Sequence, residues 1–238
     1  MKCDFSRRSH QLEMMDGDAI GFEDFRNCLR DLEIVNVCTL AYRPTLQWLK
    51  KSLRADKSRH PVSILDIGCG GGGMLRKIWN WTQRCGRETD LIGVDLNPWS
   101  KQTAEGVTPP NAPIRYETSD VFSFDPDRRA DFIISSLFTH HLTDGQVVRF
   151  LGWMDRHATR GWFINDLHRH PLAFFLARII LRTVAFDPMV QNDGPISVAR
   201  AFTAADWQRL VAEAGIPAAR VTIDWCFPFR YCVAGTTA

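Results

Sequence analysis

The sequence predicts an α/β protein with a seven-stranded, mostly parallel sheet that carries helices on both faces and ends in an antiparallel hairpin. One observation is that short apolar runs alternate with segments of helical periodicity from residue 62 onward, which is typical of a parallel sheet. The other is that only a short Pro-containing corner separates the last two β-rich runs. Such a corner is too short for a helical crossover, so these two strands are expected to pair antiparallel.

Length and composition indicate an ordinary folded protein. The 238 residues can bury a sizeable core, and 45% hydrophobic with 24% charged residues argue against disorder. A net charge of +2 gives no electrostatic reason to expect a nucleic-acid partner. The seven cysteines form no CxxC pair, so we expect no disulfide framework, no zinc site and no metal cofactor. We therefore expect a cytoplasmic protein without membrane insertion, either a monomer or a homodimer.

Residues 1–60 are expected to form a helical cap segment ahead of a main domain at 61–238. The amino terminus has no continuous apolar run of the kind found in a signal peptide. Between Glu23 and Leu53 the apolar residues recur every three or four positions, which predicts two helices, and Pro44 is placed to open the second. The polar stretch "RADKSRHP" separates this segment from the first strand.

The main domain is expected to begin with five parallel strands and the helices between them. The strands are "VSILDIG", "DLIGVDL", "PIRYETSDV", "ADFIISSLF" and "GWFINDL". Helices follow the first, second and fourth strands: "GGMLRKIWNWTQRCG", a short helix beginning at Pro98, and "TDGQVVRFLGWMDRHA". Gly86 is expected to close the first helix, and Thr143 with Gln146 is expected to start the third with a capping box.

The carboxyl-terminal part adds an insertion, a helix and the hairpin. The insertion, at 168–201, contains an amphipathic apolar helix from Pro171 to Phe186 and a turn-rich piece, "FDPMVQNDGP". The apolar helix contains two arginines and about 16 residues, too few to span a bilayer. A helix between Thr203 and Gly215 then precedes the strands "RVTIDWCF" and "FRYCVAG". The insertion and the amino-terminal helices are expected to form a lid together.

A glycine-rich loop follows the first strand and indicates a ligand site. Five of the six residues after Ile67 are glycines, and Gly68, Gly70 and Gly73 satisfy the GxGxxG pattern of Rossmann-like nucleotide-binding folds. Asp66 at the end of that strand would repel a pyrophosphate but attract an ammonium group.

Two further acids refine the choice of ligand. Asp95 ends the second strand, where it can accept hydrogen bonds from ribose hydroxyls, and Asp120 ends the third, where it suits an exocyclic amine such as that of adenine. The ligand that combines an ammonium, a ribose and an adenine without a phosphate is S-adenosylmethionine. Helix-capping or turn roles are the alternative for these acids.

The chain resembles the class I S-adenosylmethionine-dependent methyltransferases over about 175 residues, through "LDIGCGGG", "GVDLN", "TSDV" and "DFIISSLFTHHL". The resemblance implies that Asp66 holds the methionine amino group and that the loop of Gly68, Cys69 and Gly70 passes under the cofactor. It implies also that Asp95 and Leu96 lie at the ribose and Asp120 and Val121 at the adenine, with Ser135 and Ser136 against the methionyl part.

The acceptor is expected to be a small molecule that is methylated at a hydroxyl oxygen. Methylases of nucleobase and glutamine nitrogens usually carry an Asn/Asp-Pro-Pro-aromatic motif after the fourth strand, where this chain reads "SSLFTH". Candidate bases follow the fourth and fifth strands, on the edge where ligands bind in such sheets: His140, His141, Asp166 and His168. A structural role is the alternative for the histidines, and His170 is interpreted as a turn residue.

Apolar residues suggest the chemical class of the acceptor. Phe174, Phe175, Leu176, Ile179 and Ile180 form a stripe that is interpreted first as core and second as ligand wall. A lid that carries such an apolar stripe favours an aromatic or lipid-like acceptor. "YRPTLQWL" and "NDLHRHPLAFFLAR" resemble bacterial methyltransferases of polyketide-type pathways, that is, of secondary metabolism, which implies acceptor-side roles for Arg43 and His168; Phe138 and Phe175 are further candidates. The open alternatives are C- or N-methylation, a nucleic-acid methylase, and a binding module without catalysis.

Overall fold

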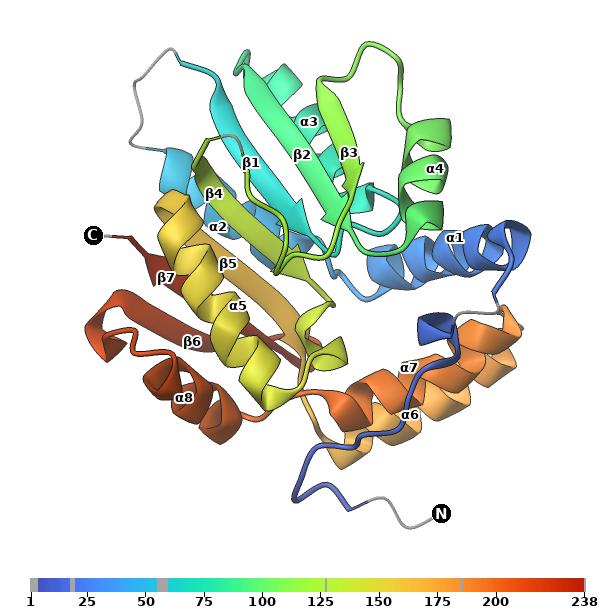
Figure 1. Ribbon diagram of the computed structural model, residues 1–238. Helices are drawn as coiled ribbons and strands as arrows, with labels where there is room; N and C mark the ends of the chain where they lie inside the picture. Colours follow the sequence, from blue (N-terminus) through green and yellow to red (C-terminus); the bar gives the residue numbers. More distant parts are fainter. Residues whose placement is uncertain (1–3, 18–19, 55–59, 127, 185, 238) are drawn as a thin grey trace.

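A seven-stranded sheet forms the centre of the computed structural model, which describes residues 4–17, 20–54, 60–126, 128–184 and 186–237 (Figure 1). The strand order is β3-β2-β1-β4-β5-β7-β6. The pairs among β1 to β5 are parallel, and β7 pairs antiparallel with both β5 and β6, which confirms the predicted sheet and hairpin. The strands are β1 (Val62–Ile67), β2 (Thr89–Asp95), β3 (Ile114–Thr118), β4 (Ala130–Ser136), β5 (Ala158–Leu167), β6 (Val221–Cys226) and β7 (Arg230–Thr236).

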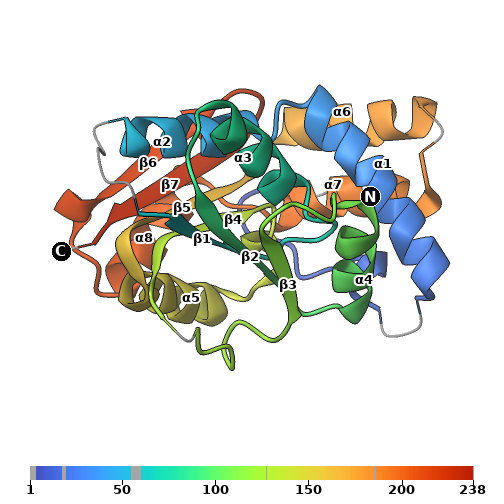
Figure 2. The ribbon, with the colours of Figure 1, turned by 90° about the horizontal axis from the view of Figure 1, so that it is seen from above.

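Helices cover both faces of the sheet and its carboxyl edge. One face is covered by α2 (Arg43–Leu53), α3 (Gly73–Arg84) and α4 (Pro98–Val107), and the other by α5 (Asp144–His157) and α8 (Ala204–Glu213), as Figure 2 shows from above. Beyond the carboxyl ends of the strands lie α1 (Phe22–Cys38), α6 (Pro171–Thr183) and α7 (Pro188–Arg200) (Figure 1). Short 3₁₀ turns are η1 (Met14–Asp16), η2 (Thr139–His141) and η3 (Ala218–Arg220).

Alternation along the strands divides the core into two layers. In β1, Leu65 packs into the cluster shared with α5 and α8, whereas its neighbour Ile64 packs into the cluster shared with α2 and α3. Successive side chains of a strand point to opposite faces, so one apolar run serves both layers. Because both faces are buried, the strand ends are the part of the sheet where polar groups can meet a ligand.

The local helix signals in the sequence are confirmed. Thr143 and Thr203 each form a capping box, with Gln146 and Asp206 as the respective partners. Pro44 lies in the first turn of α2, where a missing N–H costs nothing. Gly86 follows the end of α3 in the left-handed conformation, with φ of 62°.

The turn-rich prediction for "FDPMVQNDGP" was wrong, because most of this stretch is the first half of α7. Gly194 and Pro195 lie inside the helix, although both residues disfavour helix interiors. Packing offsets that cost: a Cβ on Gly194 would lie 2.2 Å from Cδ1 of Leu181 in α6, so only glycine lets the two helices approach so closely. Met189 and Val190 are buried in the same contact.

The core interpretation of the α6 stripe was wrong for four of its five residues. Phe174 is buried, but Phe175, Leu176, Ile179 and Ile180 are 40–60% exposed. The helix rests on α7 through its other side, where Ala173, Phe174 and Leu181 are buried. Within the described residues, no helix combines the length and apolar character needed to cross a bilayer.

Candidate active site at the carboxyl edge of the sheet

The glycine-rich loop makes a tight connection between β1 and α3. Gly68, Gly70 and Gly72 all have positive φ, from 49° to 73°, a conformation that side-chain-bearing residues rarely adopt. A Cβ on Gly68 would lie 2.7 Å from the ring of Phe138, so the loop is also closely packed. Leu29 of α1 lies over Gly70, since a Cβ there would be 3.5 Å from it. The loop therefore lies between the strand ends and α1.

Asp66 and Asp95 form a buried acidic pair beside this loop. Asp66 is 2% exposed, and its Oδ1 has no hydrogen-bond partner among the described residues. Asp95 accepts hydrogen bonds from the backbone N–H groups of Gly70 (2.8 Å) and Asn97 (3.0 Å), one on each oxygen. Burial raises the pKa of both carboxyl groups, and Asp95 raises that of Asp66 further. The arrangement favours a ligand that brings a positive charge and hydroxyl donors.

The other predicted cofactor residues lie around this pair in different environments. Asp120 lies two residues beyond the end of β3 rather than in it; it is exposed, and its Oδ1 accepts from the N–H of Phe122. Val121 is buried in the core, and Leu96 is 70% exposed. The half-buried Cys69 lies near both acids, and burial followed by Asp95 and Asp66 raises the pKa of its thiol.

The two serines at the end of β4 have partners within the protein. The Ser135 hydroxyl is fully buried and donates to the carbonyl of Ile67 in β1 (2.9 Å). The Ser136 hydroxyl lies 3.3 Å from that of Thr45 in α2. Ser135 thus joins two strands at the point where the glycine loop begins.

His140 and Asp166 form a buried imidazole–carboxylate pair at the ends of β4 and β5. Nδ1 of His140 lies 2.7 Å from one Asp166 oxygen, and the other oxygen accepts from the His140 N–H (2.9 Å) and the Thr139 hydroxyl. Burial by itself raises the pKa of Asp166, but His140, Thr139 and the Leu167 N–H lower it to about 2. Asp166 is thus an ionised carboxylate that fixes the orientation of the His140 ring.

His141 is held in the same way by an acid that the sequence analysis missed. Its Nδ1 lies 3.0 Å from Oδ1 of Asp16, and its ring lies 4.3 Å from that of His140. A second missed acid, the buried Glu13, lies between the two rings: its oxygens are 3.7 Å from Nε2 of His140 and 3.8 Å from Nε2 of His141. Burial raises the pKa of Glu13 to about 7.

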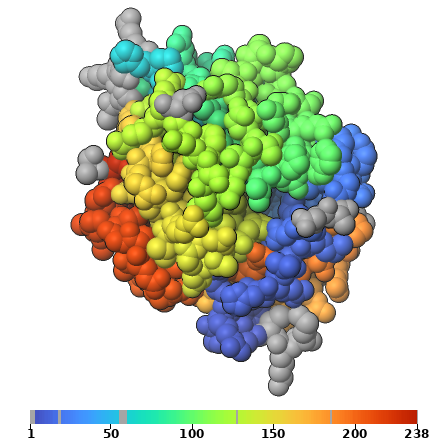
Figure 3. Space-filling model, viewed as in Figure 1, coloured from blue at the N-terminus to red at the C-terminus, as the bar shows by residue number. Residues whose placement is uncertain are grey.

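Hydrogen bonds hold the amino-terminal segment that carries these acids in place. Arg8 bonds to the carbonyls of Leu142 and Arg200 and to Asp144, and its guanidinium lies 4.0 Å from the ring centre of Phe202. Arg200 of α7 bonds to Asp16 (3.1 Å) and to the carbonyls of both histidines. Figure 3 shows the segment, in blue, on the surface beside α7 in orange. Periodicity could not reveal this contact, because the segment is irregular and its partners are distant in sequence.

His168 lies in a different set of contacts. Its Nδ1 is 3.3 Å from Nε1 of Trp225, and its ring packs against Tyr231 and His170. Of the four candidate bases, His140, His141 and Asp166 therefore lie together, whereas His168 has other neighbours. His170, interpreted as a turn residue, is the N-cap of α6 and accepts from the N–H of Leu172.

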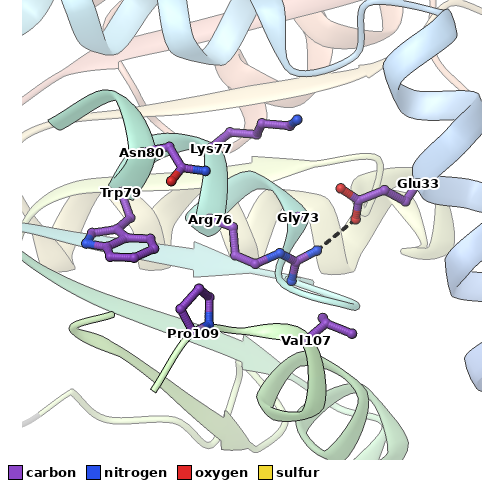
Figure 4. Close-up of a pocket in the computed structure, with 8 residues that line it drawn as sticks. All are labelled: Glu33, Gly73, Arg76, Lys77, Trp79, Asn80, Val107 and Pro109. Carbon is purple, nitrogen blue, oxygen red and sulfur yellow. Dashed lines mark hydrogen bonds and ion pairs between the residues drawn. The ribbon is translucent and has the colours of Figure 1, made fainter. Parts of the chain in front are cut away.

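The predicted acceptor-side residues are not brought together. Arg43 is exposed at the start of α2, Phe138 packs between the glycine loop and Phe150, and Phe175 is exposed on α6. A separate hollow of about 190 Å³ lies on the outer side of α3, where Arg76 pairs with Glu33 of α1 (Figure 4). Gly73 of the glycine pattern lines it, but none of the predicted acids, serines or histidines does, so it is distinct from the strand-end site.

Residues 41–216 match the model of a protein family that is described as a methyltransferase domain. No sequence relative was found among curated proteins. One similar solved structure is the plantazolicin methyltransferase BpumL in complex with SAH: it is 14% identical, has a TM-score of 0.65, and the match covers 90% of this chain and 96% of that one.

Two other solved structures are similar in fold. Human N-acetylserotonin methyltransferase in complex with SAM is 17% identical with a TM-score of 0.61, over 92% of this chain and 57% of that one. Magnesium protoporphyrin IX methyltransferase from Synechocystis PCC 6803, with bound SAH, is 15% identical with a TM-score of 0.55, over 84% of each chain. At these identities the likeness concerns the fold alone.

Proposed function

We propose, on the premise that this chain belongs to the methyltransferase domain family, that it transfers the methyl group of S-adenosylmethionine to a hydroxyl oxygen of a small, aromatic or lipid-like acceptor. The observation that carries the cofactor assignment is the buried Asp66–Asp95 pair beside the glycine loop. Buried carboxylates are costly unless a cation or hydrogen-bond donors compensate them. The cofactor's ammonium and ribose hydroxyls supply both.

The other residues at this edge fit the rest of the cofactor. Gly68, Cys69 and Gly70 present backbone rather than bulky side chains. Asp120 is an exposed carboxylate that could accept from an adenine amine, Val121 beside it is buried in the core, and the exposed Leu96 follows Asp95 directly. Ser135 and Ser136 complete the proposed set, although their hydroxyls already have partners within the protein.

The choice of a hydroxyl acceptor is supported by the His140–Asp166 pair and its neighbours. Bound S-adenosylmethionine would supply an electrophilic methyl group, so the chain has to align the acceptor and take up its proton. The cluster of Glu13, His140 and His141 has the groups for that uptake, and Asp166 fixes the His140 ring. An amine or an activated carbon would need less help of this kind.

The apolar character of the acceptor is supported by α6. This helix lies beyond the carboxyl ends of the strands, and the side that faces away from α7 is apolar. The exposed apolar residues are Leu172, Phe175, Leu176, Ile179 and Ile180. Arg43, Phe138 and His168 remain proposed acceptor-side residues. The segment 168–201 and α1 are proposed to act as the lid. The other predicted lid helix, α2, packs on a face of the sheet instead.

To test this proposal, the purified protein is incubated with methyl-labelled S-adenosylmethionine and a panel of phenols, enols and long-chain alcohols. The masses of the products are measured. We expect a methyl ether product. S-adenosylhomocysteine should bind in calorimetry, and Asp95→Ala should weaken that binding by about 1.5–3 kcal/mol. Asp90→Ala is the matched control, because Asp90 lies at the other end of β2 and pairs with Arg115 and Arg128.

His140→Ala tests the cluster. It should lower kcat by about 10²–10⁴-fold and leave cofactor affinity nearly unchanged. A normal rate in this variant, with methylation at carbon or nitrogen, would contradict the hydroxyl acceptor. Cofactor binding without transfer to any acceptor would indicate a binding module. Salt-sensitive RNA binding would indicate a nucleic-acid methylase.

A further inference from the structure

Two imidazoles at the end of β4 have the geometry of metal ligands. Asp166 lies 2.7 Å from Nδ1 of His140, and Asp16 lies 3.0 Å from Nδ1 of His141. A carboxylate on Nδ1 fixes the tautomer and leaves Nε2 as the atom with a free lone pair, an arrangement that accompanies most metal-binding histidines. The same arrangement occurs twice, on adjacent residues whose rings lie 4.3 Å apart.

Glu13 completes a three-ligand set opposite the two Nε2 atoms. Its oxygens lie 3.7 and 3.8 Å from them, too far for hydrogen bonds. One ligand atom from each of the three residues lies within 4.8 Å of the others. Ligand atoms around one ion at about 2.1 Å are separated by roughly 3.0–3.5 Å, so a small inward movement of the side chains would suffice.

The charges around the gap also favour a cation. Glu13, Asp16 and Asp166 contribute three carboxylates, whereas Arg200 contributes one guanidinium, 3.9 Å from Glu13 and 3.1 Å from Asp16. The guanidinium of Arg8 is paired with Asp144. The side chains of Glu13 and His140 are almost fully buried, and that of His141 is 22% exposed, which leaves a route from the surface.

We infer that Glu13, His140 and His141 form a binding site for a divalent transition-metal ion, with Asp166 and Asp16 orienting the two imidazoles. Two imidazoles and one carboxylate suit Zn²⁺, Fe²⁺, Co²⁺ or Mn²⁺ and leave coordination positions open. The inference goes beyond the proposed function, because the site needs neither cofactor nor methyl acceptor to bind the ion. A bound ion would occupy the Nε2 lone pairs that the metal-free protein would use for proton uptake, so the two roles belong to different states of the protein. The sequence alone predicts no metal cofactor, because Glu13 is far from the two histidines in sequence and no ligand spacing marks the three residues as a set.

The test uses Co²⁺ alone, added to chelator-treated full-length protein without cofactor or acceptor. Ligand-field absorption in the visible region should appear and saturate at one Co²⁺ per chain, and Zn²⁺ should displace it. Metal should also raise the thermal midpoint, because it binds the folded state. If Co²⁺ does not bind, the proposed methyl transfer is not contradicted. If no methyl transfer is found, the Co²⁺ titration still tests the metal site.

Variants identify the ligands. Glu13→Ala and His141→Ala should abolish the absorption, and Asp16→Asn should weaken Co²⁺ affinity by about 10–100-fold through the lost orientation of His141. His157→Ala is the matched control: Nδ1 of this imidazole also faces an acceptor, the carbonyl oxygen of Trp153, and its Nε2 lies near a carboxylate, Asp125, but it lies at the end of α5. Circular dichroism without metal establishes that each variant is folded.

Two results would overturn the inference. One is wild-type protein that shows no ligand-field absorption at stoichiometric Co²⁺, which would make the cluster a network of hydrogen bonds and charges only. The other is absorption that survives in the folded Glu13→Ala and His141→Ala variants, or that His157→Ala removes to the same extent.

Discussion

At the scale of single residues, three aspartates at the carboxyl ends of β1, β2 and β5 acquire different acidities from their surroundings. Burial dominates for Asp66 and Asp95, and the pKa of each is raised. Asp166 is just as deeply buried, yet His140 and several hydrogen bonds bring its pKa down to about 2. Asp166 thus has a positively charged partner in His140, whereas both causes that act on the pKa of Asp66, burial and Asp95, raise it.

His168 should give the folded protein a dependence on pH. Burial, then His170 and Arg169, lower its pKa below the usual 6.5. Because the folded pKa lies below the unfolded one, this contribution to stability is complete above about pH 6.5 and is lost as the pH falls through the folded pKa. We expect the unfolding free energy to fall with acidification less steeply in His168→Gln than in wild type, as measured by urea unfolding between about pH 5 and 8. Parallel curves for the two proteins would contradict the prediction.

At the scale of elements, α7 shows packing that outweighs local preference. Its interior contains Gly194 and Pro195, and its buried residues contact α6 and η1. Asp193 accepts hydrogen bonds from the backbone N–H groups of Met14 and Met15, so the helix also holds the turn that follows Glu13. The helix is therefore a support for the cluster of Glu13, His140 and His141.

Gly194→Ala should destabilise the protein, although alanine is the better helix former. The added Cβ meets the buried Leu181 at 2.2 Å, and overpacking of this kind costs about 1–3 kcal/mol. Gly106→Ala in α4 is the control, because nothing lies within 4 Å of its Cβ position, and there we expect a gain of up to about 1 kcal/mol. Urea unfolding measures both, and equal effects in the two variants would refute the packing argument.

At the scale of the whole molecule, the candidate site combines strand ends from the middle of the chain with the amino-terminal segment. Strand ends from β1, β2, β4 and β5 supply the acids and histidines, and the amino-terminal segment brings Glu13 and Asp16 to them. Figure 1 shows this segment along α7, below the carboxyl edge of the sheet. The site therefore depends on the attachment of a segment that has little regular structure.

Arg8→Met should release this segment. The change removes bonds to three backbone carbonyls and to Asp144, and we expect a loss of about 2 kcal/mol or more in unfolding free energy. Methyl transfer should fall sharply while S-adenosylhomocysteine still binds, and proteases should cut the segment faster. Arg7→Met is the matched control, since Arg7 is 85% exposed and pairs only with Asp4 among the described residues. Similar activity in both variants would show that the segment is not needed.

The sequence by itself determined most elements of this fold and the edge of the sheet where the candidate site lies. Strand periodicity, the capping box at Thr143, the N-cap at Thr203 and the short corner before β7 depend on neighbouring residues, so they can be interpreted from the chain alone. The same is true of the glycines after β1, which require positive φ wherever the loop lies. Asp66 and Asp95 could be placed because the carboxyl ends of parallel strands share one edge.

Only the tertiary structure decided what surrounds the histidines. Glu13 and Asp16 reach His140 and His141 through an irregular segment held by Arg8 and Arg200, and no periodic pattern marks such a contact. The helix α7 forms although it contains a glycine and a proline, because α6 packs on it. Most of the apolar stripe of α6 is exposed, because α7 covers only the opposite side of that helix. Local patterns fix φ, ψ and the face of an element, whereas the partner of each face depends on the summed packing of segments far apart in the chain.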